Sequence, residues 1–278
     1  MSGLFLRARL SSGCTLFFMR EKVKWFEVWK KRIRSYAAGR GFTCDACGAE
    51  LFDYPTHRLC ERCEASMRLN DGRTCEKCGR KTLAEGICLS CKSRVPRFTK
   101  GFSPFVYRGE SASLVNRIKN GNPTLALYFA EKMAEYLIAN FTEIASFTAE
   151  SGNALMVIPV PLTTARLRER GYNQAFLLAE RVCDVLNEKG FSAELYTDVL
   201  EKKRDTAQQK HMSYASRMEN VAGAYHIHDR KSCRGKTVVL IDDILTTGAT
   251  GSECASRLLS AGAERVLFLV GAALPEKK

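Results

Sequence analysis

Long apolar runs are missing from this sequence of 278 residues. A helix that spans a bilayer needs about 20 consecutive apolar residues, and no stretch of the chain approaches that length, so an integral membrane protein is excluded. The segment Leu4–Phe18 has some apolar character, but Arg7 and Arg9 interrupt it and Leu16–Met19 is too short for the apolar centre of a signal peptide. We expect either a disordered extension here or a start assigned too far upstream of Met19.

Histidine is scarce, and acidic residues are outnumbered by basic ones. The four histidines, His57, His211, His226 and His228, are scattered, and none lies in a triad-like setting beside a nucleophile. No general base or acceptor pocket is evident, so the residues alone do not establish an enzymatic activity. Lysine and arginine number 43 against 30 aspartates and glutamates, and the net charge of +13 favours anionic partners such as nucleic acid or phosphorylated small molecules.

Cysteine, by contrast, is abundant. Eight of the 12 cysteines form four Cys-x-x-Cys pairs in one short segment, which is the spacing of zinc ligands and indicates a reducing cytoplasm. A redox role would need one reactive pair on a thioredoxin-like scaffold, so we expect about two structural zinc ions, each held by four thiolates. Sequential pairing of the motifs is expected, although a cross-braced arrangement has the same spacing. The predicted ligands are Cys44, Cys47, Cys60 and Cys63 in a first quartet and Cys75, Cys78, Cys88 and Cys91 in a second.

The character of the sequence divides the chain into three segments. Residues 1–42 form an N-terminal extension in which Arg20–Arg40 has the spacing of a basic amphipathic helix, whose basic face either is solvated or contacts DNA or membrane. Residues 43–95 contain the cysteine pairs and little apolar periodicity, so metal must stabilise them in place of a core. Residues 96–278 alternate strand and helix patterns, which predicts an α/β domain with a largely parallel sheet flanked by helices. The expected helices are 111–119, 124–139, 173–187 and 250–260, and the expected strands are 154–160, 192–196, 236–241 and 265–270.

The most specific motif follows the expected strand 236–241. Asp242 and Asp243 come directly after this strand, and the sequence Thr-Thr-Gly-Ala-Thr then leads into a helix. Carboxylates at the carboxyl end of a strand can accept hydrogen bonds from ribose hydroxyls. Small residues let backbone N–H groups surround a phosphate at a helix N-terminus. The alternative is that the two aspartates only cap a turn. The predicted phosphate loop consists of Thr246, Thr247, Gly248, Ala249 and Thr250.

This order of strand, carboxylates and loop resembles the phosphoribosyl pyrophosphate motif of type I phosphoribosyltransferases. Val157–Gln174 and Arg204–Tyr225 are also similar to segments of the ComF family, which carries a cysteine-rich zinc ribbon ahead of a transferase-like domain. The resemblance covers most of residues 44–275. It implies a type I phosphoribosyltransferase-like parallel sheet preceded by a small double zinc ribbon. Gly251 departs from the pattern, because a larger apolar residue is expected there, and we expect a looser first turn of the helix.

The resemblance also implies roles for particular residues. Asp242 and Asp243 would bind the ribose hydroxyls, and the phosphate loop would hold the 5′-phosphate. Transfer needs cations on the leaving pyrophosphate, which Mg²⁺ would supply together with basic side chains. The candidate basic residues are three arginines that follow the expected strand 154–160, where transferases of this fold keep their pyrophosphate loop. The alternative is that these arginines are solvated residues before a helix. The candidate arginines are Arg166, Arg168 and Arg170, of which Arg170 joins the two aspartates as a catalytic candidate.

Four further features are weaker candidates. Asn173 and Gln174 begin a helix, where capping is their default role, but the resemblance makes at least one of them a site residue. Lys119 matches a lysine of the family and would reach a phosphate. The polar segment Lys202–Arg217 suits either a mobile lid over the substrate or an ordinary surface loop.

The resemblance implies a cytoplasmic ComF-type protein that binds phosphoribosyl pyrophosphate with Mg²⁺ and takes part in DNA uptake during natural transformation or in DNA utilisation. Whether it catalyses phosphoribosyl transfer stays open, because no acceptor is evident. The alternative is a non-catalytic adaptor that binds single-stranded DNA through its basic surface and ribbons and uses the fold as a ligand sensor. Expected partners are a phosphoribosyl compound, single-stranded DNA and DNA-uptake proteins.

Overall fold

The computed structural model describes residues 43–51, 59–204 and 221–276, all of which belong to one compact unit, Phe42–Lys278. The predicted basic helix Arg20–Arg40 and most of the predicted lid Lys202–Arg217 lie outside the described residues. Across the described part of the chain, no helix combines the length and the apolar composition needed to cross a membrane.

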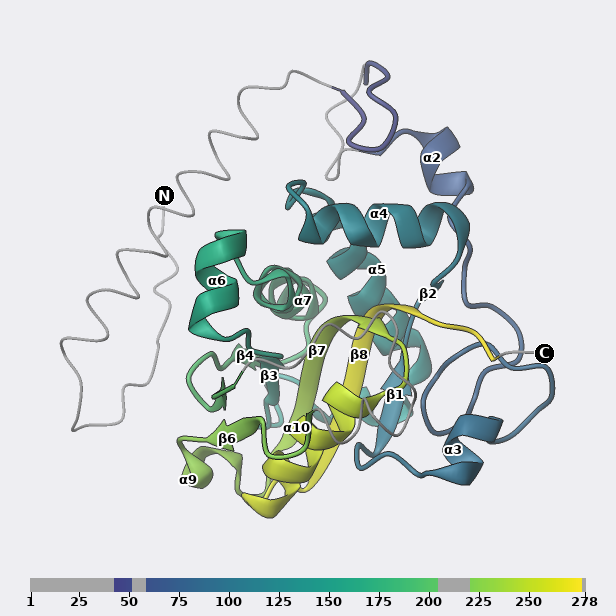
Figure 1. Ribbon diagram of the computed structural model, residues 1–278. Helices are drawn as coiled ribbons and strands as arrows, with labels where there is room; N and C mark the ends of the chain where they lie inside the picture. Colours follow the sequence, from purple (N-terminus) through teal and green to yellow (C-terminus); the bar gives the residue numbers. More distant parts are fainter. Residues whose placement is uncertain (1–42, 52–58, 205–220, 277–278) are drawn as a thin grey trace. The chain divides into compact units, whose positions relative to one another are not determined.

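A six-stranded parallel sheet forms the centre of this unit (Figure 1). Its order is β1–β8–β7–β3–β4, and β2 continues the pairing along β8. At the middle of the sheet, Ile241 of β7 pairs with Pro159 of β3 on one side and with Leu269 of β8 on the other. Both faces of β7 and β8 are covered, which explains why their sequences are nearly continuous apolar runs. The strands are β1 (Lys100–Phe102), β2 (Phe105–Val106), β3 (Leu155–Pro159), β4 (Ala193–Leu195), β7 (Thr237–Leu245) and β8 (Arg265–Ala273).

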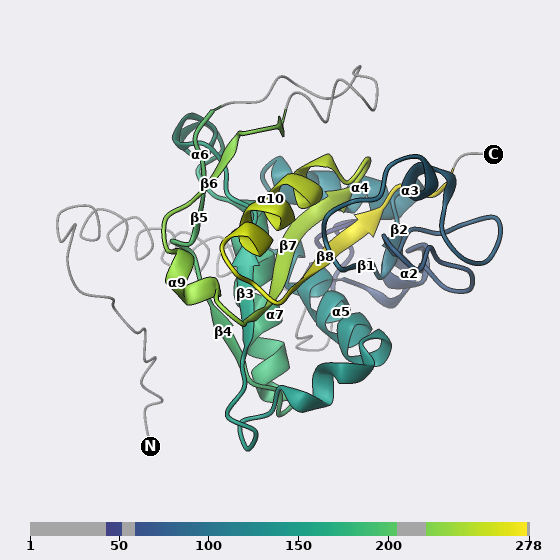
Figure 2. The same cartoon turned by 90° about the horizontal axis from the view of Figure 1, so that it is seen from below.

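Helices cover both faces of the sheet. Figure 2 shows α5 and α7 on one face and α10 on the other, which is the doubly wound arrangement. A short antiparallel pair, β5 (Leu200–Lys202) and β6 (Tyr225–Ile227), lies beside α10. These findings confirm the predicted fold class. The helices are α2 (Glu61–Ala65), α3 (Leu89–Ser93), α4 (Gly109–Lys119), α5 (Leu125–Asn140), α6 (Thr164–Arg170), α7 (Gln174–Glu188), α9 (Arg230–Cys233) and α10 (Ala249–Ser260), with a 3-10 turn η1 (Thr142–Ser146).

The predicted long elements agree with the structure to within a few residues, except that β7 runs four residues further than expected, through both aspartates to Leu245. The short elements α6, β1, β2, β5 and β6 were not predicted. Segments of two to seven residues do not span enough of a helical or strand repeat to stand out from their surroundings.

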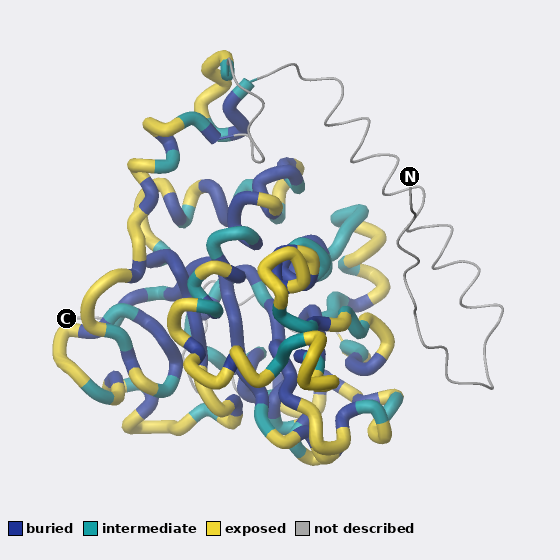
Figure 3. Tube along the Cα trace, turned by 180° about the vertical axis from the view of Figure 1, so that it is seen from behind, coloured by how far each residue is buried: buried dark blue, intermediate teal, exposed yellow. Residues whose placement is uncertain are grey.

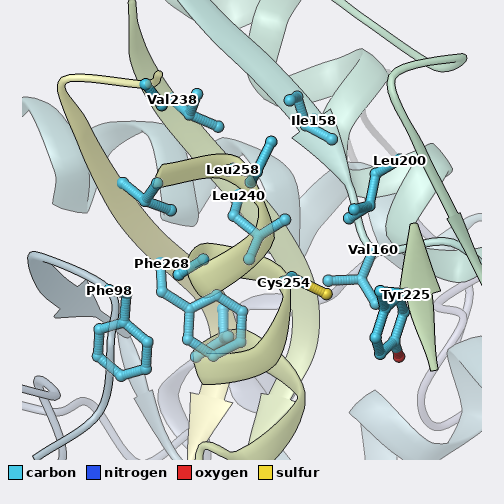
Figure 4. Packing of buried hydrophobic residues seen from close by; sticks show 14 of the residues in the cluster. Phe98, Ile158, Val160, Leu200, Tyr225, Val238, Leu240, Cys254, Leu258 and Phe268 are labelled. Atoms are coloured by element: carbon cyan, nitrogen blue, oxygen red, sulfur yellow. The ribbon is translucent and has the colours of Figure 1, made fainter. Parts of the chain in front are cut away.

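The second cysteine quartet packs into the core of the α/β unit. Its four sulfur-bearing side chains are buried in the same cluster as Phe98 and the residues of β7, β8 and α10 that face it. Figure 4 shows Phe98 beside Phe268, and their ring centres are 5.2 Å apart. Gly79 lies so close to β1 that a Cβ on it would be 2.3 Å from the carbonyl oxygen of Gly101. Contacts therefore cross the predicted segment boundary at residues 95 and 96, which itself stays a prediction.

The end of the described chain also contacts this quartet. Glu276 accepts hydrogen bonds from the backbone N–H groups of Leu83 at 3.3 Å and Leu89 at 2.7 Å, and its own N–H donates to the Lys81 carbonyl at 2.9 Å. Figure 3 shows the buried strands at the centre of the unit and the largely exposed loops around them. The loop between Cys78 and Cys88 is thus fastened to the carboxyl-terminal end of the sheet.

Candidate functional site

The two predicted ribose-binding aspartates lie near the carboxyl end of β7 on opposite faces of the strand, since side chains alternate along a strand. Asp243 is buried, and Asp242 is half-buried. The N–H of Asp243 donates to Oδ1 of Asp242 at 2.9 Å. Asp242 lies on the side of α10, close enough to Cys254 for its charge to add to the effect of burial in raising the pKa of that thiol. The site therefore presents one carboxylate to each side of the strand end.

Lys119 balances the charge of Asp243. It is the last residue of α4, and its Nζ atom lies 2.8 Å from Oδ2 of Asp243, an oxygen that makes no directional hydrogen bond among the described residues. Burial acts to lower the pKa of Lys119, but the Asp243 carboxylate, with smaller contributions from Asp242 and Tyr107, raises the pKa overall. Tyr172 holds the end of α4 in place, because its hydroxyl donates to the carbonyl of Ile118 and accepts the N–H of Gly121 at 3.2 Å. The predicted lysine is thus part of the same cluster as Asp243.

Asp242 has an unusual protonation equilibrium. Burial, with a further contribution from the neighbouring Asp243 carboxylate, raises the pKa of Asp242 to about 8. A carboxyl group with this pKa is largely protonated at neutral pH in the free protein. It can then donate a hydrogen bond to a ligand hydroxyl, or it can ionise when a cation binds nearby.

The predicted phosphate loop connects β7 to α10. Gly248 adopts a left-handed conformation with φ of 80°, which glycine takes without a Cβ clash, and it is the N-cap of α10. The hydroxyl of Thr247 accepts the N–H of Ala249 at 3.3 Å, and the carbonyl of Gly248 accepts the N–H of Ser252 at 2.8 Å. Amides of the loop and of the first turn of this 12-residue helix lie where an anion is favoured by the helix dipole.

Gly251 has a packing reason for its departure from the family pattern. A Cβ at this position would lie 2.5 Å from Cε1 of Phe268, so the Phe268 ring fills the space that a larger residue at 251 would occupy. The helix is continuous from Ala249 to Ser260, so the expected loosening of its first turn is not seen. Phe98 extends this aromatic support, because its ring would lie 3.7 Å from a Cβ on Gly248.

The predicted pyrophosphate-binding arginines lie on the short helix α6. Its N-cap is Thr163, whose hydroxyl accepts the N–H of Arg166 at 3.3 Å. Arg166 and Arg170 are four residues apart and share one face of the helix, whereas Arg168 points to another side and is exposed. Arg166 pairs with Glu169 at 2.7 Å. The structure thus brings two of the three arginines onto one face.

The next two predicted residues begin α7. Asn173 is the N-cap: its Oδ1 accepts the N–H of Ala175 at 3.0 Å, and its Nδ2 donates to the Val160 carbonyl at 3.1 Å. Gln174 is buried, and its Oε1 accepts a hydrogen bond from Arg170 at 3.1 Å. Asn173 thus joins the end of β3 to the start of α7, and Gln174 orients Arg170.

Both cysteine quartets have the geometry of a metal site. In each quartet the four sulfur atoms lie within 4.8 Å of one another, and the quartets are those of sequential pairing. The sulfur atoms of Cys47 and Cys60 are 3.7 Å apart, and those of Cys78 and Cys88 are 3.8 Å apart. A tetrahedron of sulfurs at about 2.3 Å from a zinc ion has edges of about 3.8 Å. The donor set and the spacing therefore fit a tetrahedral ion.

Backbone N–H groups that point at the cysteine sulfurs also favour metal binding by both quartets. The N–H groups of Cys78 and Cys88 point at the sulfur of Cys75 at 3.5 and 3.3 Å, and the N–H of Cys60 points at the sulfur of Cys44 at 3.3 Å. Such donors stabilise thiolates in a metal-binding turn. In each quartet, the backbone thus supplies hydrogen-bond donors to one of the ligand sulfurs.

Each quartet is attached to a different part of the candidate site. Next to the first quartet, Oδ2 of Asp45 accepts a hydrogen bond from Thr124 at 2.6 Å, and the Ala46 carbonyl accepts one from Arg117 of α4 at 2.8 Å. The second quartet is attached through Arg80, whose guanidinium donates to the carbonyl of Thr246 in the phosphate loop. Sequence reasoning missed Arg80, because only its burial distinguishes it from the other basic residues of the ribbon.

A cavity of about 360 Å³ beside α10 is separate from this site. Its lining includes Arg94, Arg97, Ser252 and Glu253, and none of residues 242–250 contributes to it.

Comparison with known proteins fits this geometry. The family model "Phosphoribosyl transferase domain" matches residues 172–278, which contain β7, the phosphate loop and α10. Competence protein ComFC of Bacillus subtilis is 27% identical over 212 residues, covering 75% of this chain and 80% of that protein. Competence protein F of Haemophilus influenzae is 25% identical over 227 residues, covering 81% and 94%. Over three quarters of its length, the chain is thus similar to proteins of the ComF family.

Another similar ComF relative is DNA utilization protein YhgH of Salmonella typhimurium, which is 28% identical over 211 residues and covered over 87% of its length. Among solved structures, a hypoxanthine phosphoribosyltransferase of Staphylococcus aureus aligns over 54% of this chain and 76% of that chain, with 14% identity and a TM-score of 0.30. The match to the phosphoribosyl transferase domain and the parallel sheet flanked by helices together show a phosphoribosyltransferase-like fold.

Proposed function

We propose that this protein binds phosphoribosyl pyrophosphate together with Mg²⁺ at the carboxyl end of β7. The observation that carries the proposal is the succession of Asp242, Asp243 and the phosphate loop at the start of α10. The loop amides would hold the 5′-phosphate, and the two carboxyl groups would contact the ribose hydroxyls. Mg²⁺, which prefers oxygen ligands, would offset the negative charge of the pyrophosphate when bound.

The pyrophosphate side of the proposed site is basic. Arg166 and Arg170 share a face of α6, and Lys119 lies at the end of α4 beside Asp243. We assign Arg170 to the leaving group, with Gln174 fixing its guanidinium through their hydrogen bond. Lys119 would then lie near both the Asp243 carboxylate and a phosphate of the bound ligand. Arg168 points to another side of α6, so we give it the weaker role of adding positive charge to the approach.

Calorimetry with phosphoribosyl pyrophosphate and Mg²⁺ tests this assignment. We expect wild-type protein to bind, Asp242→Asn to bind more weakly and the double variant Asp242→Ala/Asp243→Ala to lose binding. Asp71→Ala is the matched control, because that aspartate is exposed and pairs only with Lys81 in the ribbon among its described contacts. Absence of binding by folded wild-type protein would overturn the ligand assignment.

Zinc is the metal that we propose for the two quartets. Four thiolates in a closed tetrahedron with edges near 3.8 Å are typical of structural zinc. The eight ligands are reduced in the structure, and a compartment that keeps thiols reduced suits them, so we propose that the protein acts in the cytoplasm.

We further propose that the protein takes part in DNA uptake or DNA utilisation. The support is the similarity to relatives that carry the names competence protein and DNA utilization protein, together with a net charge of +13. Affinity for single-stranded DNA should fall steeply as salt rises, because binding to phosphates releases counterions. A flat salt response would contradict a basic DNA-binding surface. Release of pyrophosphate in the presence of candidate acceptor bases and amines would separate a transferase from an adaptor that only senses the ligand.

A further inference from the structure

Arg80 joins the second cysteine quartet to the phosphate loop. Its side chain is buried, with the residue only 5% exposed. Its Nε atom donates to the sulfur of Cys78 at 3.2 Å, and its Nη2 atom donates to the carbonyl oxygen of Thr246 at 2.8 Å. Arg80 and Thr246 are 166 residues apart along the chain, so the contact between them is purely tertiary.

The contact with Thr246 fixes the orientation of the first peptide of the loop. A trans peptide is planar, and its C=O and N–H groups point in opposite directions. Because the Thr246 carbonyl points at Arg80, the N–H of Thr247 points away from it. The direction of this amide, one of those available to a bound phosphate, is therefore set by a side chain from the cysteine ribbon.

The contact with Cys78 depends on where that sulfur is held. A metal ion bound by the second quartet would fix all four sulfurs, and four thiolates around a divalent ion leave a net negative charge beside the guanidinium. Arginine suits this place because its planar fork presents donors in fixed directions to two acceptors at once. Without the metal, the Cys78 sulfur would lose its fixed position. Arg80 would then lose one of the two contacts that orient its guanidinium group.

We propose that Arg80 is a positioning residue that makes the order of the phosphate loop depend on metal binding at the second cysteine quartet. The quartet then does more than hold a ribbon together, because its metal-bound state reaches the anion-binding loop through one side chain. Only the identity of the anion rests on the function proposed above; the coupling itself concerns the free protein.

Amide hydrogen exchange of residues 242–250 tests the coupling without any ligand. In Arg80→Ala we expect exchange in the loop to be about tenfold faster, in line with the loss of a buried hydrogen bond to a charged group, while zinc content stays that of wild type. Arg80→Lys keeps a cation beside the Cys78 sulfur but cannot serve both acceptors, so it should also exchange faster in the loop. Arg73→Ala, in the same ribbon with a side chain that is 62% exposed, is the matched control and should leave loop exchange unchanged.

The outcomes separate this proposal from the assignment of the ligand. Unchanged loop exchange in Arg80→Lys or Arg80→Ala with metal retained overturns the coupling. If Arg80→Ala loses its metal, Arg80→Lys with metal retained decides the question. Calorimetry of the same variants with phosphoribosyl pyrophosphate and Mg²⁺ should show an affinity about tenfold weaker than wild type. Faster loop exchange in a protein whose wild type binds no phosphoribosyl pyrophosphate would support the coupling and refute the ligand.

Discussion

Replacing Asp242 with asparagine is expected to make the free protein more stable at neutral and alkaline pH. Burial, with the neighbouring Asp243 carboxylate, raises the pKa of Asp242 from 3.8 to about 8. Between these two pH values the folded state holds a proton that the unfolded state has lost, so the stability of wild type falls as pH rises through this window. Asparagine has a similar shape and no charge to desolvate, so the variant avoids this loss.

The size of the gain follows from the same pKa difference. The full step from 3.8 to about 8 corresponds to about 6 kcal/mol at 1.36 kcal/mol per pH unit. Asp242 keeps part of its surface open to solvent, so water recovers much of this cost. We expect a gain of about 1–2 kcal/mol near pH 8 that falls to near zero near pH 4.

Urea unfolding of wild type and Asp242→Asn across this pH range measures the effect. Asp71→Asn is a control of opposite sign, because a hydrogen bond and the charge of Lys81 lower the pKa of the exposed Asp71, so its loss should not stabilise the protein as pH rises. A gain for Asp242→Asn that does not change with pH, or a loss of stability near pH 8, would refute the protonation argument. The same variant should bind phosphoribosyl pyrophosphate more weakly, which would mark Asp242 as a residue kept for function at a cost in stability.

Three further predictions follow from the contacts described above. Elemental analysis should find about two zinc ions per chain, and a folded protein free of metal would contradict the metal assignment. Gly251→Ala should lower the free energy of unfolding by about 1–3 kcal/mol, because its methyl group would overlap the ring of Phe268, and Phe268→Leu in the same chain should recover part of the loss. Lys119→Met should cost about 2–3 kcal/mol by leaving the buried Asp243 carboxylate without its ion pair. An equal cost of Lys119→Met in an Asp243→Asn background would show that the ion pair is not the cause.

Most of the central sheet was predictable from local patterns. The apolar run 236–241 and the glycine-containing loop after it are contiguous in sequence, so their order already indicated a strand, a phosphate loop and a helix. The long helices α5 and α7 were evident because three or more turns repeat the apolar spacing. The cysteine quartets were also predictable, since Cys-x-x-Cys spacing places two sulfurs on one ion.

The rest of the site depends on contacts between distant segments. Nothing local to Arg80 indicates that it reaches Thr246, and nothing local to Gly251 indicates that the Phe268 ring fills its place. The family resemblance suggested only that Lys119 reaches a phosphate, and its pairing with Asp243 was not predicted, because the packing of α4 on the sheet brings the two residues together. The helical form of the segment with the arginines escaped prediction because seven residues give too little periodicity.

The hydrogen bonds of Glu276 have a consequence for how the protein is made. The ribosome releases residues in order, so the loop between Cys78 and Cys88 emerges long before Glu276, which later binds the N–H groups of Leu83 and Leu89. Strand β1, which follows the second quartet in the chain, likewise cannot pair until β8 has been synthesised. The second cysteine quartet therefore reaches its final surroundings only at the end of translation, and a nascent chain cut short before β8 would expose its cysteines to any metal or oxidant present.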